Sequence, residues 1–574
     1  MSAKKAKRRL VRTGTALWLG LSSALSAGQA LIPREASHGM VVSTQRLASE
    51  AGLAVLKRGG NAVDAAVATA FALAVVYPSC GNIGGEGFLL FYRNDGFATA
   101  VDFRLQAPAA ARPEMFLNAA GTGPGKSPVE GLSITDSPLA VGIPGTVAGL
   151  ALAHRRYGSR PWADLLAPAL ELAEQGFPVS SSLSREMRDS REYFLKYRSS
   201  AAFFLKKDGA VYEPEEVWVQ PDLARTLKRI QKNGEDEFYR GETARRIVAD
   251  IQKHGGIVTL DDLAGYRAIE RRPARGEYRG YDILAMPLPS SGGVAQTEIL
   301  NILEGYDLGA MGHNSARYLH VLTEAMRRVY RDRALYLGDP DFNPDIPVER
   351  LTSKAYAAGL RKTIDLERAS RSDDPAAFAR GGEKRQTTHF SVVDAAGNAI
   401  SLTYTLNGDF GAYLVAEGTG VVLNNSLPDF DNRVGPNGSG QANLIEPGKR
   451  PLSSMTPTIV VKGGRPVWVL GSPGGKTIIS TNVQVILNLI DFKMNVAEAV
   501  AAPRIYHGWM PDETLFQKGV TTLDSRRLYE AMGHKVVDFR GLFGPAMIIG
   551  IGGGSTRLRG ACDPRSSDGW AAGY

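Results

Sequence analysis

Residues 387–394 read Thr-Thr-His-Phe-Ser-Val-Val-Asp, and after a short turn the chain returns as residues 399–406. Apolar and polar side chains alternate in places along both stretches, which predicts a β-hairpin. The hairpin begins at Thr387, directly after a polar run that ends at Gln386. A hydroxyl residue that opens a strand pair could serve as the nucleophile of an enzyme that cleaves its own chain.

The chemistry of an N-terminal threonine suits this position. A threonine hydroxyl is a weak nucleophile unless a base takes its proton, and an N-terminal threonine carries that base in its own α-amine. The unperturbed pKa of an α-amine is about 7.7 to 8.0, so a useful fraction is neutral near physiological pH. Cleavage of the Gln386–Thr387 bond would therefore create nucleophile and base together. The alternative is structural, because threonine is favoured in strands and the pair could simply begin a hairpin.

The charge of the chain is concentrated at its N-terminus. The 574 residues are 44% apolar and 22% charged, which is typical of a soluble globular protein, and the length allows about three to four domain-sized units. The formal charge is +8, but residues 1–30 contain six basic residues and no acidic one, so the remainder carries 8 − 6 = +2. We therefore expect no nucleic-acid partner.

The N-terminal tail has the order of a secretory signal: a basic stretch, an apolar run and then small residues up to Ala30. The apolar run is shorter than the about 20 residues that span a membrane comfortably. We expect residues 1–30 to be removed and the mature chain to be periplasmic or extracellular. An uncleaved signal that anchors the chain in the membrane is the alternative.

Cysteine and histidine usage argues against a disulfide framework and against a metal. Cys80 and Cys562 are the two cysteines, and two separate buried thiols fit better than a bridge between them. The eight histidines are scattered, and no Cys or His cluster has the spacing of a zinc site. We predict no metal and no cofactor.

The order of predicted elements indicates stacked layers of helices and strands. Helical patterns occur at residues 47–56, 62–76, 147–156, 162–175, 223–231, 243–253, 295–303, 315–337 and 477–489. Strand signals occur at residues 88–92, 388–393, 400–404, 420–423, 458–461 and 466–470.

Two glycine-rich segments invite a nucleotide-binding interpretation. Residues 81–87, Gly-Asn-Ile-Gly-Gly-Glu-Gly, follow a predicted helix and precede a strand, the reverse of the order in a dinucleotide-binding loop. Residues 471–477, Gly-Ser-Pro-Gly-Gly-Lys-Thr, lie between a strand and a helix as a P-loop does, but their glycines are one position too close. The N–H groups of Gly474 and Gly475 could instead hold an oxyanion, and a purely structural glycine turn is the alternative.

Three further residue groups could recognise a zwitterionic substrate. Residues 450–455, Arg-Pro-Leu-Ser-Ser-Met, combine a cation with paired hydroxyls, which suits a carboxylate. Arg104, after the predicted strand at residues 99–103, could bind a carboxylate through its planar fork. Asp429 could accept a hydrogen bond from an ammonium group. Each alone is more often a surface or turn residue, so their meaning depends on whether they converge in space.

Taken together, these segments resemble the γ-glutamyltransferase (γ-glutamyltranspeptidase) family over residues 38–574. The motifs are Leu47-Ala-Ser-Glu-Ala-Gly, Gly59-Gly-Asn-Ala-Val-Asp-Ala-Ala, Val101-Asp-Phe-Arg, Pro289-Ser-Ser-Gly-Gly, Thr387-Thr-His-Phe-Ser-Val-Val-Asp, Thr403-Tyr-Thr-Leu-Asn, Arg450-Pro-Leu-Ser-Ser-Met, Gly471-Ser-Pro-Gly-Gly and Asp563-Pro-Arg. The resemblance implies an α+β fold, the four-layered αββα sandwich of the N-terminal nucleophile hydrolases.

The resemblance also implies the roles of individual residues. Thr387 would attack the bond after Gln386 and divide the chain into a large subunit, residues 31–386, and a small subunit, residues 387–574, which remain together as a heterodimer. The other matches are Thr405, which positions the nucleophile; Asn407, which contacts the substrate; Arg104, Ser453 and Ser454, which hold the α-carboxylate; Asp429, which accepts from the α-amine; and Gly474 and Gly475, which form the oxyanion hole.

The implied activity is transfer of a γ-glutamyl group from glutathione or a related amide, through a Thr387 ester, to water, an amino acid or a peptide. An acylase of the glutaryl or cephalosporin type is the alternative in the same class, although Asp429 argues against it because a glutaryl group has no amine. A nucleotide-binding protein that uses residues 471–477 is the alternative in a different class.

Three departures from the family pattern affect the substrate site. Ser426 replaces the usual Gln or Glu that shares the α-amine with the aspartate, and Leu105 follows Arg104 where an acidic residue is common. The segment from Asp429 to Arg450 is several residues short, with Ser439 near the position of a covering aromatic residue. We expect an open site that admits larger donors.

Overall fold

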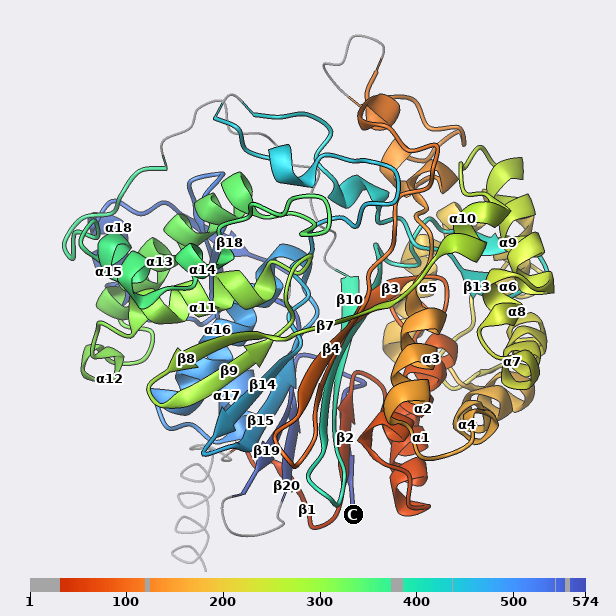
Figure 1. Ribbon diagram of the computed structural model, residues 1–574, viewed down its shortest axis with the longest axis horizontal. Coiled ribbons are helices and arrows are strands. Elements are labelled where there is room, and N and C mark those ends of the chain that lie inside the picture. The colour runs from red at the N-terminus through yellow and green to blue at the C-terminus, as the bar shows by residue number, and fades with distance from the viewer. Residues whose placement is uncertain (1–30, 119–123, 373–385, 436, 542, 553–557) are drawn as a thin grey trace, which may run out of the picture. The chain divides into compact units, whose positions relative to one another are not determined.

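Two seven-stranded β-sheets, here called sheet A and sheet B, make up the centre of the fold (Figure 1). The structure, a computed structural model, describes residues 31–118, 124–372, 386–435, 437–541, 543–552 and 558–574. The predicted signal at residues 1–30 and the segment 373–385 before the predicted cleavage bond lie outside the described residues.

The strands of both sheets come from both halves of the chain. Sheet A contains, in spatial order, β1 (Arg34–Ala36), β20 (Leu558–Cys562), β19 (Met547–Ile551), β15 (Arg465–Gly471), β14 (Thr458–Lys462), β9 (Tyr281–Ala285) and β8 (Ala274–Tyr278). Sheet B contains β21 (Trp570–Gly573), β2 (Met40–Ser43), β10 (Gln386–Val393), β11 (Ala399–Asn407), β3 (Glu86–Tyr92), β4 (Ala98–Phe103) and β7 (Ile269–Arg271). Segments before and after residue 386 are thus hydrogen-bonded to one another within each sheet.

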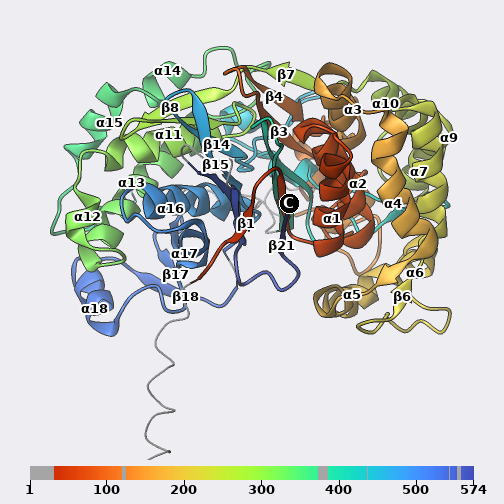
Figure 2. The same cartoon turned by 90° about the horizontal axis from the view of Figure 1, so that it is seen from below.

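The two sheets face each other and are covered by helices on their outer faces. Side chains such as Phe88 and Leu90 of sheet B pack with Val469 and Ile549 of sheet A in one apolar core. On the outer face of sheet B lie α1 (Arg46–Lys57), α2 (Ala62–Val76) and α3 (Thr146–Tyr157); on that of sheet A lie α11 (Gly292–Leu303), α16 (Ile478–Ile490) and α17 (Val496–Ala501). Figure 2 shows the same layers from below. The arrangement is the predicted four-layered αββα sandwich.

The remaining elements extend or connect these layers. The further helices are α4 (Trp162–Gln175), α5 (Ser181–Phe194), α6 (Arg198–Phe204), α7 (Pro221–Asn233), α8 (Asp236–Tyr239), α9 (Glu242–Lys253), α10 (Leu260–Gly265), α12 (Leu308–Met311), α13 (Ala316–Tyr336), α14 (Val348–Leu351), α15 (Lys354–Arg361) and α18 (Leu523–Ala531). The short strands are β5 (Phe177–Pro178), β6 (Val217–Trp218), β12 (Val415–Ala416), β13 (Val421–Val422), β16 (Ile505–His507), β17 (Thr514–Gln517) and β18 (Val536–Phe539).

Helix α2 illustrates how the local sequence decides an element. Every residue from Ala62 to Val76 is buried, because the helix lies between sheet B and the outer helix α4. The Asn61 side chain caps the helix by accepting hydrogen bonds from the N–H groups of Val63 and Asp64. The Asp64 carboxylate accepts one from the N–H of Asn61, which completes a capping box. The predicted bounds 62–76 are confirmed.

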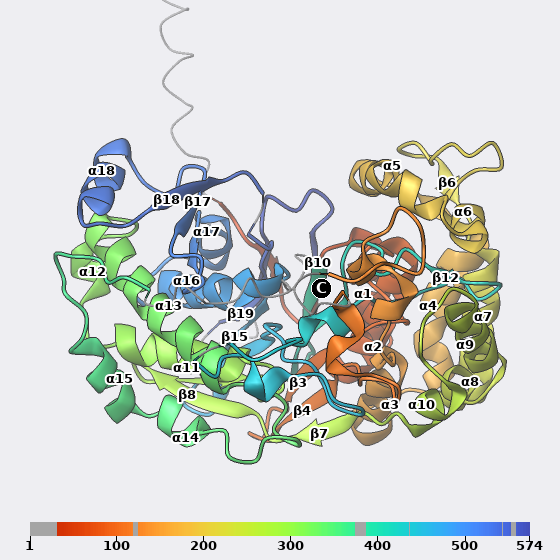
Figure 3. The same cartoon turned by 90° about the horizontal axis from the view of Figure 1, so that it is seen from above.

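The hairpin at residue 387 is also confirmed. β10 and β11 are antiparallel neighbours in the middle of sheet B, and Figure 3 shows β10 between the two helical layers. Residues 420–423 differ from the prediction, since only Val421–Val422 is a strand and it pairs with β12 outside both sheets.

Cys80 and Cys562 are free thiols, as favoured by the sequence, with Cys562 only partly buried. Among the described helices, none has the length and apolar character needed to cross a membrane.

We expect acid to destabilise the protein partly through Glu324 on α13. Burial alone would raise the pKa of Glu324, but a hydrogen bond from Ser370 and the guanidinium groups of Arg327 and Arg328 lower it to about 2. An unfolded Glu has a pKa of about 4.3. The folded value is the lower one, so the stabilisation, on the order of 3 kcal/mol, is present above about pH 4.3 and is lost as the pH falls toward 2.

The measurement is the thermal midpoint of wild type and Glu324→Gln at several pH values between neutral and acid. The variant should be less stable at neutral pH and should lose less stability on acidification. Parallel pH curves for the two proteins would contradict this assignment.

Candidate active site

Thr387 lies where the register of the β10–β11 hairpin shifts. Gln386 pairs with Asn407 and Thr388 pairs with Tyr404, so Thr387 faces two residues of β11, Thr405 and Leu406. Such an irregularity is a β-bulge, which bends a strand and re-aims a side chain. The predicted nucleophile is therefore at a break in the ladder near the end of sheet B.

The hydroxyl groups of Thr387 and Thr405 are neighbours. Their Oγ1 atoms are 3.4 Å apart, and Thr405 Oγ1 accepts a hydrogen bond of 2.7 Å from the N–H of Asn407. Both threonines are almost completely buried. Asn407 has a φ of 80°, a left-handed conformation that asparagine tolerates better than most residues.

Arg104 is held between two carboxylates. Its Nη1 donates to Glu86 Oε1 at 2.5 Å and its Nη2 donates to Asp429 Oδ2 at 2.5 Å. The second oxygen of Glu86 accepts from the N–H of Leu105 at 2.7 Å, and Glu86 and Arg104 are fully buried. Burial raises the pKa of Glu86 despite the opposing effect of Arg104. The Arg104–Glu86 and Arg104–Asp429 ion pairs are thus both buried away from water.

Asp429 links this cluster to the nucleophile. Its Oδ1 accepts from Asn407 Nδ2 at 3.1 Å, so Arg104 and Asn407 bind the two oxygens of one carboxylate. A small pocket of about 10 Å³ is lined by Arg104, Thr387, Thr405, Asn407, Asp429, Ser453, Met455, Gly475 and Ile478. This volume is about that of one water molecule.

The two serines predicted to hold a carboxylate occupy different positions. Ser453 lines the pocket, whereas Ser454 does not and accepts a hydrogen bond of 3.1 Å from Arg333 Nη2. Ser426 and Ser439 are also buried and do not line the pocket. The Ser426 hydroxyl lies beside the Glu86 carboxylate and, as a hydrogen-bond donor to it, lowers the pKa of Glu86.

The loop before α16 requires glycine for steric reasons. Gly474 has a φ of 129° and Gly475 a φ of 54°, and a Cβ on Gly474 would lie 2.7 Å from Thr477 Oγ1. Gly475 lines the pocket that contains Thr387. Lys476, the cation that a P-loop would direct at a phosphate, lies over the ring of Tyr506 at 5.5 Å. Of the two glycines predicted to hold an oxyanion, Gly475 lines the pocket and Gly474 does not.

Arg450 was one candidate for recognising a substrate carboxylate, but the carboxylate nearest to its Nη1 is that of buried Asp102, at 3.5 Å from Oδ1. Arg450 Nη1 donates to the backbone oxygen of Arg104, and its Nη2 donates to that of Arg267 at 2.7 Å. The Tyr266 hydroxyl donates to the same Arg104 oxygen at 2.8 Å. Arg450 therefore supports the backbone of Arg104 from behind and does not reach the pocket.

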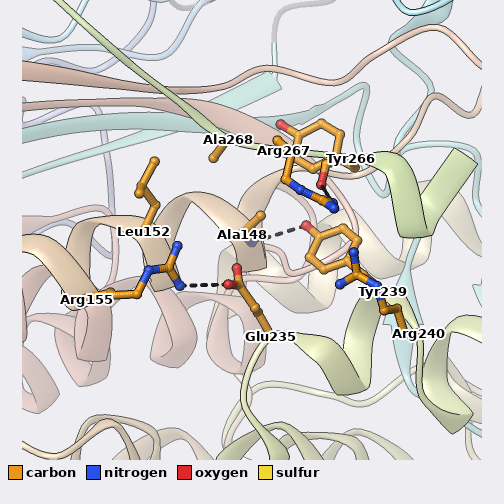
Figure 4. Close-up of a pocket in the computed structure, with 9 residues that line it drawn as sticks. All are labelled: Ala148, Leu152, Arg155, Glu235, Tyr239, Arg240, Tyr266, Arg267 and Ala268. Carbon is orange, nitrogen blue, oxygen red and sulfur yellow. Dashed lines mark hydrogen bonds and ion pairs between the residues drawn. The ribbon is translucent and has the colours of Figure 1, made fainter.

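Tyr266 and Arg267 also border a second cavity of about 180 Å³ (Figure 4). Its other lining residues are Ala148, Leu152, Arg155, Glu235, Tyr239, Arg240 and Ala268. Figure 4 shows the Arg155–Glu235 ion pair across it. None of the sequence-predicted site residues lines this cavity, so it is separate from the candidate active site.

One group within the described residues has the composition of a metal site. His320, Glu324 and His534 place potential ligand atoms within 4.8 Å of one another, and the spacing of four along α13 was the signal in the sequence. These atoms already have partners: His320 Nδ1 and His534 Nε2 form a hydrogen bond of 2.7 Å, and Glu324 binds two arginines. The potential metal-ligand atoms are therefore already used in hydrogen bonds and ion pairs within the protein.

Comparison with known proteins agrees with this geometry. A model of the family described as Gamma-glutamyltranspeptidase matches residues 48–573. The Glutathione hydrolase proenzyme of Escherichia coli (strain K12) is 46% identical over 550 residues, covering 94% of this chain and 93% of the relative.

Relatives named as acylases are also found. The Acylase ACY 1 proenzyme of Pseudomonas sp. (strain SE83) is 38% identical, covering 92% of this chain and 93% of the relative. The crystal structure of cephalosporin acylase from Bacillus halodurans superposes with a TM-score of 0.84 at 29% identity, covering 96% of this chain and 98% of that one. On the family match and the identity over nearly the whole length, the chain belongs to the γ-glutamyltranspeptidase family of enzymes.

Proposed function

We propose that the chain cleaves itself between Gln386 and Thr387 and then acts as a γ-glutamyl transferase and hydrolase. The observation that carries the proposal is that Thr387, Thr405, Arg104 and Asp429 line one pocket. The similar Escherichia coli protein is named a proenzyme and a glutathione hydrolase, which supports both parts. Because both sheets contain strands from each side of residue 386, the two fragments would remain one folded heterodimer.

Cleavage would begin with attack of Thr387 Oγ1 on the carbonyl carbon of Gln386. The C–N bond breaks, an ester forms, and water hydrolyses the ester to leave a carboxylate on Gln386 and a free α-amine on Thr387. Thr405, 3.4 Å from the nucleophile, would position the hydroxyl. The new α-amine then supplies the base that the intact chain lacks.

In turnover the α-amine would take the hydroxyl proton while Thr387 Oγ1 attacks the γ-carbonyl of the donor. The N–H groups of Gly474 and Gly475 would stabilise the oxyanion. The leaving amine takes the proton and departs, and the γ-glutamyl group remains as an ester. Water, an amino acid or a peptide then attacks that ester and restores the hydroxyl of Thr387.

Recognition of the donor would use both charges of its α-carbon. Arg104 would bind the α-carboxylate with Ser453, and Ser454 would support this loop through its bond with Arg333. Asp429 and Asn407 would receive the α-amine. Glutathione is the expected donor, and an exported chain without residues 1–30 is the expected mature form.

An acylase of the glutaryl type is the second candidate, since similar proteins carry acylase names. The test compares γ-glutamyl and glutaryl amides of one chromogenic amine. A clear preference for the γ-glutamyl amide is expected, because Asp429 offers a carboxylate to the amine that glutaryl lacks. A clear glutaryl preference would favour the acylase.

The variant Asp429→Asn should lose this preference. The change keeps the shape of the side chain but removes the charge, and a hydrogen bond to a charged group is worth about 1.5–3 kcal/mol, so we expect the ratio of kcat/KM values to fall about tenfold to hundredfold. Asp431→Asn is the matched control, because Asp431 binds Asn443 and lies outside the pocket lining. An unchanged ratio in Asp429→Asn would remove Asp429 from amine recognition.

A further inference from the structure

Glu86 lies at the centre of a row of side chains that crosses sheet B at the proposed active site. Its Cα pairs with that of Thr405 on β11. On its other side, Gly87 pairs with Phe103, so the next step of this antiparallel register sets Glu86 opposite Arg104. Glu86 thus stands between the threonine beside the nucleophile and the arginine proposed to bind the donor.

The glycines at residues 81–87 allow the chain around Glu86 to lie very close to β11. A Cβ on Gly85 would lie 2.1 Å from the backbone oxygen of Thr405, and a Cβ on Gly87 would lie 2.4 Å from the Cβ of Tyr404. Glycine is therefore needed on both sides of Glu86 for the chain to run this close to β11. The glycines that make residues 81–87 resemble a nucleotide-binding loop therefore serve to place the Glu86 carboxylate next to β11.

Both oxygens of that carboxylate are used within the protein. One accepts from Arg104 Nη1 and the other from the N–H of Leu105, and Glu86 has no exposed surface and does not line the pocket. The Leu105 side chain, at the position where an acidic residue is common in the family, packs in an apolar cluster. The carboxylate beside Arg104 therefore comes from the neighbouring strand.

We propose that Glu86 is a positioning residue that holds Arg104 for the donor's α-carboxylate and so allows Asp429 to bind the α-amine. The proposal rests on the proposed function. Arg104 uses Nη1 for Glu86 and Nη2 for Asp429. When the donor's α-carboxylate takes over Nη2, Asp429 turns to the amine, while Glu86 keeps Arg104 oriented and its charge balanced.

Without the charge of Glu86, the Asp429 carboxylate still binds Arg104 and competes with the donor for it. The variant Glu86→Gln should therefore raise KM for a γ-glutamyl amide about tenfold or more, as a weakened charged hydrogen bond predicts. The kcat should change less than about threefold, because Thr387 and the oxyanion loop are intact. The preference for γ-glutamyl over glutaryl amide should fall with it.

The control is Glu324→Gln, which removes a buried, paired carboxylate from α13. It should lower thermal stability and leave KM unchanged. Glu86→Asp is the second variant: it keeps the charge but withdraws it by one methylene, and a smaller rise in KM is expected.

A wild-type KM in cleaved Glu86→Gln, or a loss confined to kcat, would overturn the proposal. Loss of the folded protein in both Glu86 variants would also overturn it, because Glu86 would then be a folding residue. A wild-type protein that leaves the γ-glutamyl amide intact would instead contradict the proposed function.

Discussion

Thr387→Ala is expected to remain a single intact chain without measurable turnover of a γ-glutamyl amide. The change removes the hydroxyl that attacks Gln386 and later the donor, and no other hydroxyl takes its place at the register shift of β10. Thr405 is the nearest candidate, but it lies inside β11, two residues before the end of the strand, and never acquires an α-amine. The loss should be as complete as removal of a covalent nucleophile usually is, about 10⁴-fold or more.

The measurement is a denaturing gel together with a colorimetric assay. Thr388→Ala is the matched control, since Thr388 Oγ1 bonds Thr44 Oγ1 at 2.7 Å and points to a different neighbour. The control should cleave and turn over with near wild-type rates. Two fragments, or substantial turnover, in Thr387→Ala would remove Thr387 from its proposed role.

Arg104→Lys is expected to cause the second largest loss. Lysine keeps the charge but cannot present two parallel N–H groups, so it cannot serve Glu86 and the donor's α-carboxylate together. Breaking a buried ion pair costs about 3–5 kcal/mol, which corresponds to a fall in kcat/KM of about a hundredfold to several thousandfold if it is expressed in donor binding. We expect most of the loss in KM.

The control for this change is Arg279→Lys. Arg279 also pairs with a largely buried carboxylate, that of Asp491 at 2.7 Å, but it belongs to the turn between β8 and β9 of sheet A. Steady-state kinetics of both variants should separate a general cost of replacing arginine from a specific one. Equal kinetic losses in the two proteins would contradict a substrate role for Arg104.

The fold could be predicted wherever local signals agreed with one another. The bounds of α2 follow from the Asn61 cap and a continuous apolar run, and the hairpin at residue 387 follows from alternation and a short turn. Residues 420–423 were less predictable, because an apolar stretch in a loop can pair locally, as Val421–Val422 does with β12. The pattern of apolar and polar residues indicates which face of a strand is buried, but it does not indicate which sheet the strand joins.

The site could be predicted only in part, because its contacts join distant segments. Arg104 and Asp429 are 325 positions apart, and no spacing rule indicates that they share an ion pair. Arg450 was a candidate for carboxylate recognition because paired serines follow it, yet its side chain binds the backbone oxygen of Arg104. Glu86 was hidden in a glycine-rich stretch whose meaning depends on the close approach of β11.

The most direct measurement is the N-terminal sequence of the smaller fragment of the purified wild-type protein, supported by its intact mass. The account predicts two fragments on a denaturing gel, with the smaller one beginning at Thr387. A single chain that survives prolonged incubation, or a fragment that begins at any other residue, would contradict the claim that Thr387 becomes an N-terminal nucleophile.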